Sequence, residues 1–130
     1  MQRKTFLTIA ALIAVAVGFL ALIVPEILLD SKGVVPSASV NLWMREVGVL
    51  LIASGLTAFL ARQESDSGAL RALFAGNLVL QLGLLPVEPI AYANGVITKL
   101  SGIMPNTILH MVLALGFGFY LVKMRNVKEE

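Results

Sequence analysis

The chain has 130 residues, of which 58% are hydrophobic and 14% are charged, and its mean hydropathy is +0.88. A water-soluble domain of this length has about 45–50% apolar and about 25% charged residues, so the composition excludes an ordinary soluble domain. The absence of cysteine excludes disulfides, thiolate metal sites and thiol redox chemistry, and a net charge of +2 gives no support to a nucleic-acid partner.

Residues 5–24 form the first predicted membrane span, since they carry no charge. A hydrocarbon core of about 30 Å needs about 20 helical residues. The run follows two basic residues, as a signal peptide does, but it is too long for the apolar region of one. The next residues, Val24-Pro25-Glu26, also form a poor cleavage site. We therefore interpret this segment as a retained span.

Three further apolar stretches, 40–62, 69–85 and 105–122, are candidates for spans. The stretch 40–62 includes Arg45 and Glu46. The stretch 69–85 is short, and bilayer thinning or snorkelling can accommodate a short span. The sequence therefore predicts an all-α protein with one integral membrane domain over 1–130, folded as an up-and-down bundle of four transmembrane helices in the lipid bilayer.

Basic residues predict the orientation of this bundle. One side of the predicted membrane has seven of them: Arg3, Lys4, Arg62, Arg71, Lys123, Arg125 and Lys128. The other side has three: Lys32, Arg45 and Lys99. Because positive charge is retained on the cytoplasmic side, we expect both termini in the cytoplasm of a bacterial cell and a multi-pass protein of the inner membrane.

The two longer connections, 25–39 and 86–104, are partly apolar and predict short interfacial helices or caps on the outer side. We expect Pro25, Pro86 and Pro89 to end helices, because proline removes a backbone donor.

These connections also resemble each other: Pro25-Glu26-Ile27 and Gly33-Val34-Val35 have counterparts about 62 residues later in Glu88-Pro89-Ile90 and Gly95-Val96-Ile97. The similarity favours two tandem helix hairpins, 1–62 and 63–130, and chance resemblance is the alternative.

Small residues repeat at helical spacing on every predicted span. The stripes are Ala10, Ala14 and Gly18; Gly48 and Gly55; Gly76 and Gly83; and Ala114 and Gly118. In lipid, such stripes allow helix backbones to approach closely. They predict tight packing within the bundle, or contact with a membrane-protein partner or a second copy of the chain.

Polar side chains from three spans lie at a similar depth below the outer ends of their helices: Arg45, Glu46, Gln81 and His110. At about 1.5 Å per residue, this depth is roughly 6–8 Å, with Glu88 just above. Asn77 shares a helix face with Gln81, and Trp43 fits the aromatic belt at the interface. We therefore predict a ligand-binding pocket formed by these side chains: Arg45, Glu46, Gln81, His110, Asn77 and Trp43.

Arg45 has three interpretations, because a charge at this depth normally pairs with another group or faces a polar cavity. It can snorkel to the headgroups, with Glu46 solvated at the mouth. It can turn inward and clamp an anion or a carbonyl. It can also belong to a structural network with His110 or Gln81.

His110 is most simply a hydrogen-bonded packing residue, although histidine can also transfer protons or ligate a pigment. One histidine cannot supply both axial ligands of a haem, and a zinc site needs three or four ligands. The sequence therefore predicts no metal site and disfavours pigment ligation by His110. No serine nucleophile has a base nearby and no phosphate-binding glycine loop occurs, so no catalytic residue is predicted and an enzyme is not indicated.

Several short motifs together suggest a family: Val24-Pro25-Glu26, Arg45-x-x-Gly48 with Gly55, Arg71 with Asn77, and His110. In these the chain resembles, over nearly its whole length, the small four-helix bacterial membrane proteins grouped as DoxX-like, many of them uncharacterised. The resemblance implies an up-and-down four-helix bundle. The namesake members are linked to quinone-coupled sulfur oxidation, but the resemblance carries no catalytic residue set to this chain.

Our leading hypothesis is an integral membrane protein that binds a small lipophilic molecule, such as a quinone or isoprenoid, in an outer-leaflet polar pocket. Arg45 or Gln81 would hold a carbonyl, and His110 could exchange a proton. The first alternative is a non-catalytic accessory subunit of a larger membrane complex. The second is a small oligomeric transporter or channel, which four short helices disfavour because they enclose little lumen.

Overall fold

A computed structural model describes residues 1–124. Within this range the chain forms helices and no strand. The elements are α1 (Arg3–Ile23), α2 (Pro25–Lys32), α3 (Ala38–Leu60), the 3-10 turn η1 (Ala61–Gln63), α4 (Gly68–Leu84), α5 (Val87–Ala93) and α6 (Leu100–Lys123). Two of the basic residues used to predict orientation, Arg125 and Lys128, lie outside the described residues.

Four helical segments are long and apolar enough to cross a membrane. They are Arg3–Ile23, Ala38–Gln63, Gly68–Ala93 and Leu100–Lys123. The prediction of an all-helical chain with four candidate spans is thereby confirmed.

Serine side chains fix where two of the long helices begin. The Ser37 hydroxyl accepts a hydrogen bond from the Val40 amide at 3.3 Å, at the start of α3. The Ser67 hydroxyl accepts one from the Leu70 amide at 3.2 Å, at the start of α4. A serine at this position satisfies an amide that has no partner within the helix, so both serines act as N-caps.

Prolines mark helix boundaries less regularly than expected. Pro25 opens α2, and Pro86 separates α4 from α5. Pro89, expected to end a helix, instead lies in the first turn of α5, where proline removes no intrahelical hydrogen bond. Pro105 lies inside α6, which begins earlier, at Leu100. The helix continues through it, although proline removes one intrahelical hydrogen bond and crowds the carbonyl four residues back.

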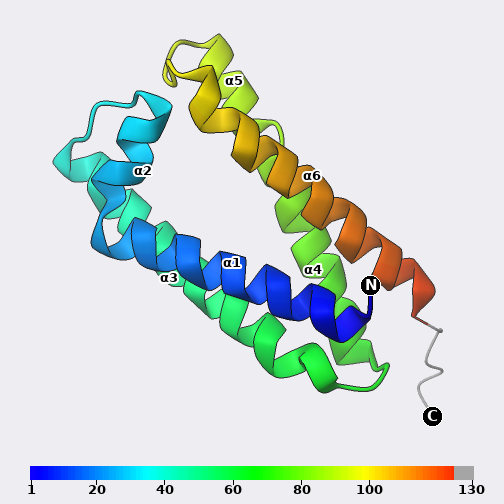
Figure 1. The fold of residues 1–130 in the computed structure, drawn as a ribbon. Helices are drawn as coiled ribbons and strands as arrows, with labels where there is room; N and C mark the ends of the chain where they lie inside the picture. The colour runs from blue at the N-terminus through cyan, green and yellow to red at the C-terminus, as the bar shows by residue number, and fades with distance from the viewer. Residues whose placement is uncertain (125–130) are drawn as a thin grey trace.

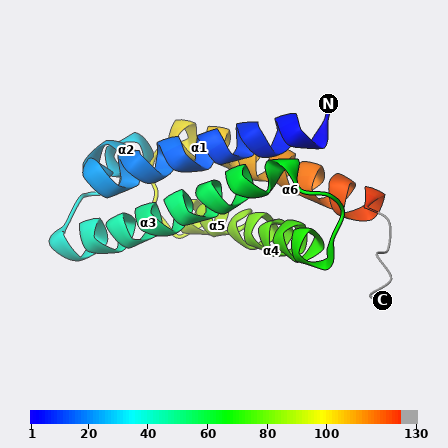
Figure 2. The ribbon, with the colours of Figure 1, turned by 90° about the horizontal axis from the view of Figure 1, so that it is seen from below.

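The long helices pack as two pairs, α1 with α3 and α4 with α6 (Figure 1). A second view shows α1 and α3 side by side along their length (Figure 2). Their backbones nearly touch, because a Cβ atom placed on Gly48 would lie 2.7 Å from both the Gly18 carbonyl oxygen and the Leu22 amide nitrogen. The stripes predicted on these two helices are therefore packing surfaces.

The stripe predicted on α4 behaves differently. A Cβ atom on Gly76 or on Gly83 would meet no atom of residues 1–124 within 4 Å. These glycines therefore do not pack α4 against another described helix of this chain. Their spacing of seven residues places them on one face of α4, but this face points away from α6 and from the other pair.

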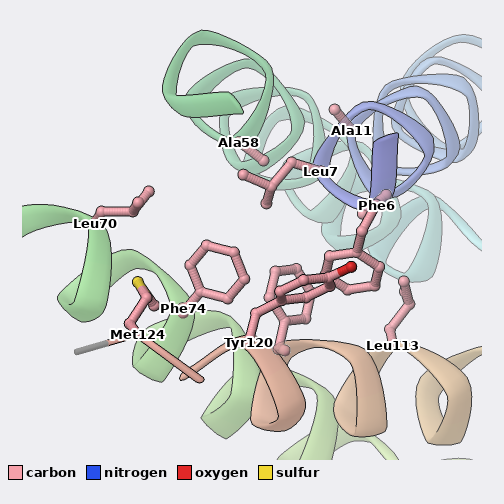
Figure 3. Packing of buried hydrophobic residues seen from close by; sticks show 11 residues of the cluster. Phe6, Leu7, Ala11, Ala58, Leu70, Phe74, Leu113, Tyr120 and Met124 are labelled. Atoms are coloured by element: carbon pink, nitrogen blue, oxygen red, sulfur yellow. The ribbon is translucent and has the colours of Figure 1, made fainter. Parts of the chain in front are cut away.

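An aromatic cluster joins the two pairs at the end where the chain begins (Figure 3). The ring of Phe6, from α1, lies edge-on to Phe117 of α6, with centroids 4.9 Å apart. Phe74 of α4 contacts Phe117 in the same way at 5.6 Å. The Tyr120 hydroxyl donates to the Met1 carbonyl at 2.5 Å, so the chain start and the end of α6 lie together.

A polar strap joins the pairs at the opposite end. The amides of Thr98 and Lys99 both donate to the Lys32 carbonyl at 3.1 Å. The Thr98 hydroxyl donates to the Gly33 carbonyl at 3.0 Å, and the Lys32 ammonium pairs with the Glu88 carboxylate. The two helix pairs thus contact each other at both ends, through aromatic packing at one end and through hydrogen bonds and an ion pair at the other.

The short helices α2 and α5 end in the same way. Gly33 and Gly95, each the residue with positive φ in its turn, have φ of 69° and 74°. In both turns the glycine amide bonds a carbonyl three residues back, and the next residue, Val34 or Val96, bonds one five residues back. This pair of backbone hydrogen bonds defines a Schellman motif, which requires a residue in the left-handed conformation. The match agrees with the predicted tandem hairpins 1–62 and 63–130, whose duplication stays a prediction.

Candidate ligand-binding cavity

A cavity of about 410 Å³ lies between the two helix pairs, and all six α-helices contribute to its lining. Most of the lining is aliphatic. Seven polar or charged side chains face it: Lys32, Ser54, Asn77, Gln81, Glu88, Asn106 and His110.

The polar groups gather at the end of the cavity closed by α2 and α5. Lys32 ends α2, Glu88 belongs to α5, and Gln81 is in the last turn of α4. At the other end the lining includes Ala10 and Phe117, and both belong to the core cluster beside the chain start. The cavity is therefore amphipathic along its length, with a polar end and an apolar end.

Gln81 and His110 form the central polar pair. The Gln81 Oε1 and His110 Nδ1 atoms are 2.6 Å apart, and Gln81 is only 7% exposed. A carbonyl oxygen only accepts, so Nδ1 carries the proton and donates it to Gln81. In the neutral imidazole, the other ring nitrogen, Nε2, is then an acceptor. The structure thus brings together two of the predicted site residues, as their common depth suggests.

Glu88 is the centre of a second polar group. Its carboxylate pairs with the Lys32 ammonium, and the two side chains are 18% and 17% exposed. Its Oε1 atom also accepts a hydrogen bond from the Asn106 amide at 2.8 Å. Its Oε2 atom is buried and has no hydrogen-bond partner among the described residues. A buried acceptor without a partner costs free energy, so this oxygen calls for a donor from water or from a ligand.

Asn77, a predicted site residue, lies one helical turn before Gln81 in α4. Its side chain forms hydrogen bonds within α4 and with α3. Its amide donates to the Leu73 carbonyl at 2.9 Å, one turn back in α4. The Ser54 hydroxyl of α3 donates to its carbonyl oxygen at 3.4 Å. Asn77 therefore helps to join α3 to α4 beside the cavity.

The structure corrects the prediction for Arg45, Glu46 and Trp43. All three side chains are exposed, Trp43 by 66%, and none lines the cavity. The reason is the rotation of about 100° per residue along a helix. Because Met44 and Val47 of α3 face the cavity, Arg45 and Glu46 between them point to other sides. The exposure of Arg45 agrees with the interpretation in which it snorkels, and not with an inward clamp.

Four polar or charged lining residues are absent from the predicted pocket: Lys32, Ser54, Glu88, which was expected just above it, and Asn106. Asn106 lies four residues before His110, hence on the same helix face, and this spacing could have identified it. Lys32 has no comparable signal. It reaches the site because α2 folds back against the segment that opens α6, and this contact joins residues 66 or more positions apart.

Within residues 1–124, no group of three or more histidine, aspartate or glutamate side chains could hold a metal ion. Compared with protein-family models, curated proteins and solved structures, the chain has no match. The resemblance to DoxX-like proteins stays a prediction, and function is inferred from the cavity.

Proposed function

We propose that this protein binds a small lipophilic molecule, of the isoprenoid or quinone-like class, in the cavity between its helix pairs. The observation that carries the proposal is the cavity's amphipathic character: about 410 Å³, mostly aliphatic, with polar side chains gathered at one end. Ligand pockets of about 300–1,000 Å³ with a few placed polar groups are typical of small-molecule sites.

The cavity suits an amphiphile that lies along the bundle. Its head would contact Gln81 and His110, and its tail would extend toward Phe117. His110 and Phe117 are seven residues apart along α6, which corresponds to about 10 Å. Binding is proposed here, and no reaction is assigned to these side chains.

The location follows from the basic residues and is part of the proposal. We place both termini in the bacterial cytoplasm and the strap at the periplasmic side of the inner membrane, because the end near the chain start carries more lysine and arginine. The polar end of the cavity would then lie in the outer leaflet.

The direct test is to purify the protein in a mild detergent and identify bound lipids by mass spectrometry. The substitution Val17→Trp adds bulk to the cavity lining, whereas Val79→Trp adds it to a side chain that is 70% exposed and outside the lining. We expect a retained lipophilic species in the wild type and in Val79→Trp, and its loss in Val17→Trp. Equal lipid content in all three proteins, each monodisperse in size-exclusion chromatography, would contradict the proposal.

A second candidate function, an accessory subunit of a membrane complex, is favoured by the unpacked face of α4. Gly76 and Gly83 leave that face open to a neighbouring helix. A stoichiometric partner that copurifies with the wild type and is lost in Gly76→Leu would support this function. Retention of lipid without any partner would leave the first proposal as the better account.

A further inference from the structure

We infer that the head of the bound molecule is a neutral hydroxyl group, so that the ligand is a lipid alcohol or phenol and not a carbonyl-only or phosphorylated lipid. This inference rests on the proposed binding function. It is drawn from the hydrogen-bonding capacity and the charge that the polar end of the cavity leaves unused.

The first observation is a donor and an acceptor side by side. Gln81 uses its Oε1 atom to accept from His110 Nδ1, so its amide nitrogen keeps donor capacity for a ligand. His110 keeps an acceptor at Nε2, for which the described residues provide no hydrogen bond. A ketone or quinone oxygen only accepts and could satisfy Gln81 alone. A hydroxyl both donates and accepts, so it suits either group.

The second observation is the buried Oε2 atom of Glu88. It has no partner among the described residues, although Oε1 of the same carboxylate binds Lys32 and Asn106. Both Glu88 and His110 line the polar end of the cavity, and the Glu88 Oε2 and His110 Nε2 acceptors have no donor among the described residues. An ether, ester or oxidised quinone head would leave both unpaired, whereas an alcohol, phenol or reduced quinol can donate to one of them.

The third observation concerns charge. Lys32 and Glu88 are the charged residues that line the cavity within the described chain, and they neutralise each other. Arg45, which could have balanced an anionic head, points away from the cavity. A phosphate head would thus enter a partly dry site without a free countercharge, which is costly. The electrostatics favour a neutral head.

The test uses three probes with one isoprenoid tail: farnesol, farnesyl methyl ether and farnesyl phosphate. Binding to the full-length protein in nanodiscs is measured by native mass spectrometry. We expect farnesol to bind roughly tenfold more tightly than the ether, because an unpaired buried acceptor costs about that much in affinity. The phosphate is also expected to bind more weakly than farnesol.

Variants locate the effect. His110→Phe keeps a ring but removes Nε2, and Gln81→Leu removes the amide donor. Each is expected to lower farnesol binding several-fold while leaving ether binding nearly unchanged. Arg45→Gln, at an exposed position outside the lining, is the matched control and should behave as the wild type. Size-exclusion profiles identify any variant that fails to fold, and the other variant then carries the test.

The outcomes separate this inference from the proposed function. If farnesol and the ether bind equally, and Val17→Trp abolishes both, the cavity binds lipids but the hydroxyl inference is wrong. Tighter binding of farnesyl phosphate would overturn it in favour of an anionic head. If Val17→Trp changes the binding of no probe, the cavity is not a lipid site and the proposed function fails as well.

Discussion

The two halves of the molecule share an order of elements but are held together by different means. In the first half, α1 and α3 meet through backbone contacts at Gly18, Gly48 and Gly55. In the second, a Cβ atom on Gly118 of α6 would be 3.8 Å from Leu78 of α4, an ordinary contact between side chains. The first half is thus a close-packed support, and the second carries most of the polar groups of the cavity. Equal glycine spacing does not produce equal packing.

The largest effect is expected from Gly48→Ala. Its new Cβ atom would be 2.7 Å from backbone atoms of Gly18 and Leu22, which cannot rotate away as a side chain can. Helices α1 and α3 would have to separate, at a cost of about 2–3 kcal/mol. A lower midpoint of thermal unfolding in detergent, measured by fluorescence-detected size-exclusion chromatography, checks this.

The matched control is Gly83→Ala, because a Cβ atom at that position meets no described atom within 4 Å. Its unfolding midpoint should equal that of the wild type. Equal losses in the two variants would show that Gly83 packs against something outside residues 1–124, and the two halves would then not differ in how tightly their glycines pack.

Parts of the fold and of the candidate site can be predicted from the sequence, and other parts cannot. Apolar runs predict the four long helices, because length and hydrophobicity determine which segments can span a bilayer. Depth along each helix also predicts that Gln81 and His110 meet. Depth does not give the rotation of a helix about its axis. It therefore cannot show that Met44 lines the cavity whereas Arg45, the next residue, does not. The contribution of Lys32 depends on how α2 folds back, which no local pattern encodes.

A second comparison concerns the glutamates of the short helices. Glu26 accepts a hydrogen bond from Asn41 at 2.7 Å, and Glu88 accepts one from Asn106 at 2.8 Å. In each half, an asparagine of the following long helix binds the glutamate of the short one. Only Glu88 lines the cavity and pairs with Lys32 among the described residues. One arrangement therefore occurs twice, with an added ion pair in the second half.

We accordingly expect Glu88→Gln to destabilise the protein more than Glu26→Gln. Glutamine can still accept from the asparagine in both variants, but only Glu88→Gln leaves a partly buried Lys32 without its counter-charge. The cost should be about 1–2 kcal/mol, between the values for exposed and buried pairs. Thermal unfolding of both variants measures the difference. The charge swap Lys32→Glu with Glu88→Lys should recover part of the loss, and no recovery would mean that the pair itself contributes little.

The smallest difference in loss of stability is expected between glycine substitutions in the two turns that end α2 and α5. Gly33→Ala and Gly95→Ala both place a side chain at positive φ, which costs about 1 kcal/mol or more. Gly33 has an additional constraint, because its Cβ atom would overlap the Thr98 hydroxyl that binds the Gly33 carbonyl. Gly33→Ala should therefore cost about 1 kcal/mol more, the value of one hydrogen bond.

Adding Thr98→Ala to each variant tests that reason. In the Gly33→Ala protein it removes the overlap, so the double variant should lose less stability than the sum of the two single losses. In the Gly95→Ala protein the two losses should simply add, because none of the described residues has an atom within 4 Å of a Cβ atom at position 95. If both pairs add, the Thr98 hydroxyl does not constrain position 33, and the link between α2 and the start of α6 rests on the bonds from the Thr98 and Lys99 amides to the Lys32 carbonyl.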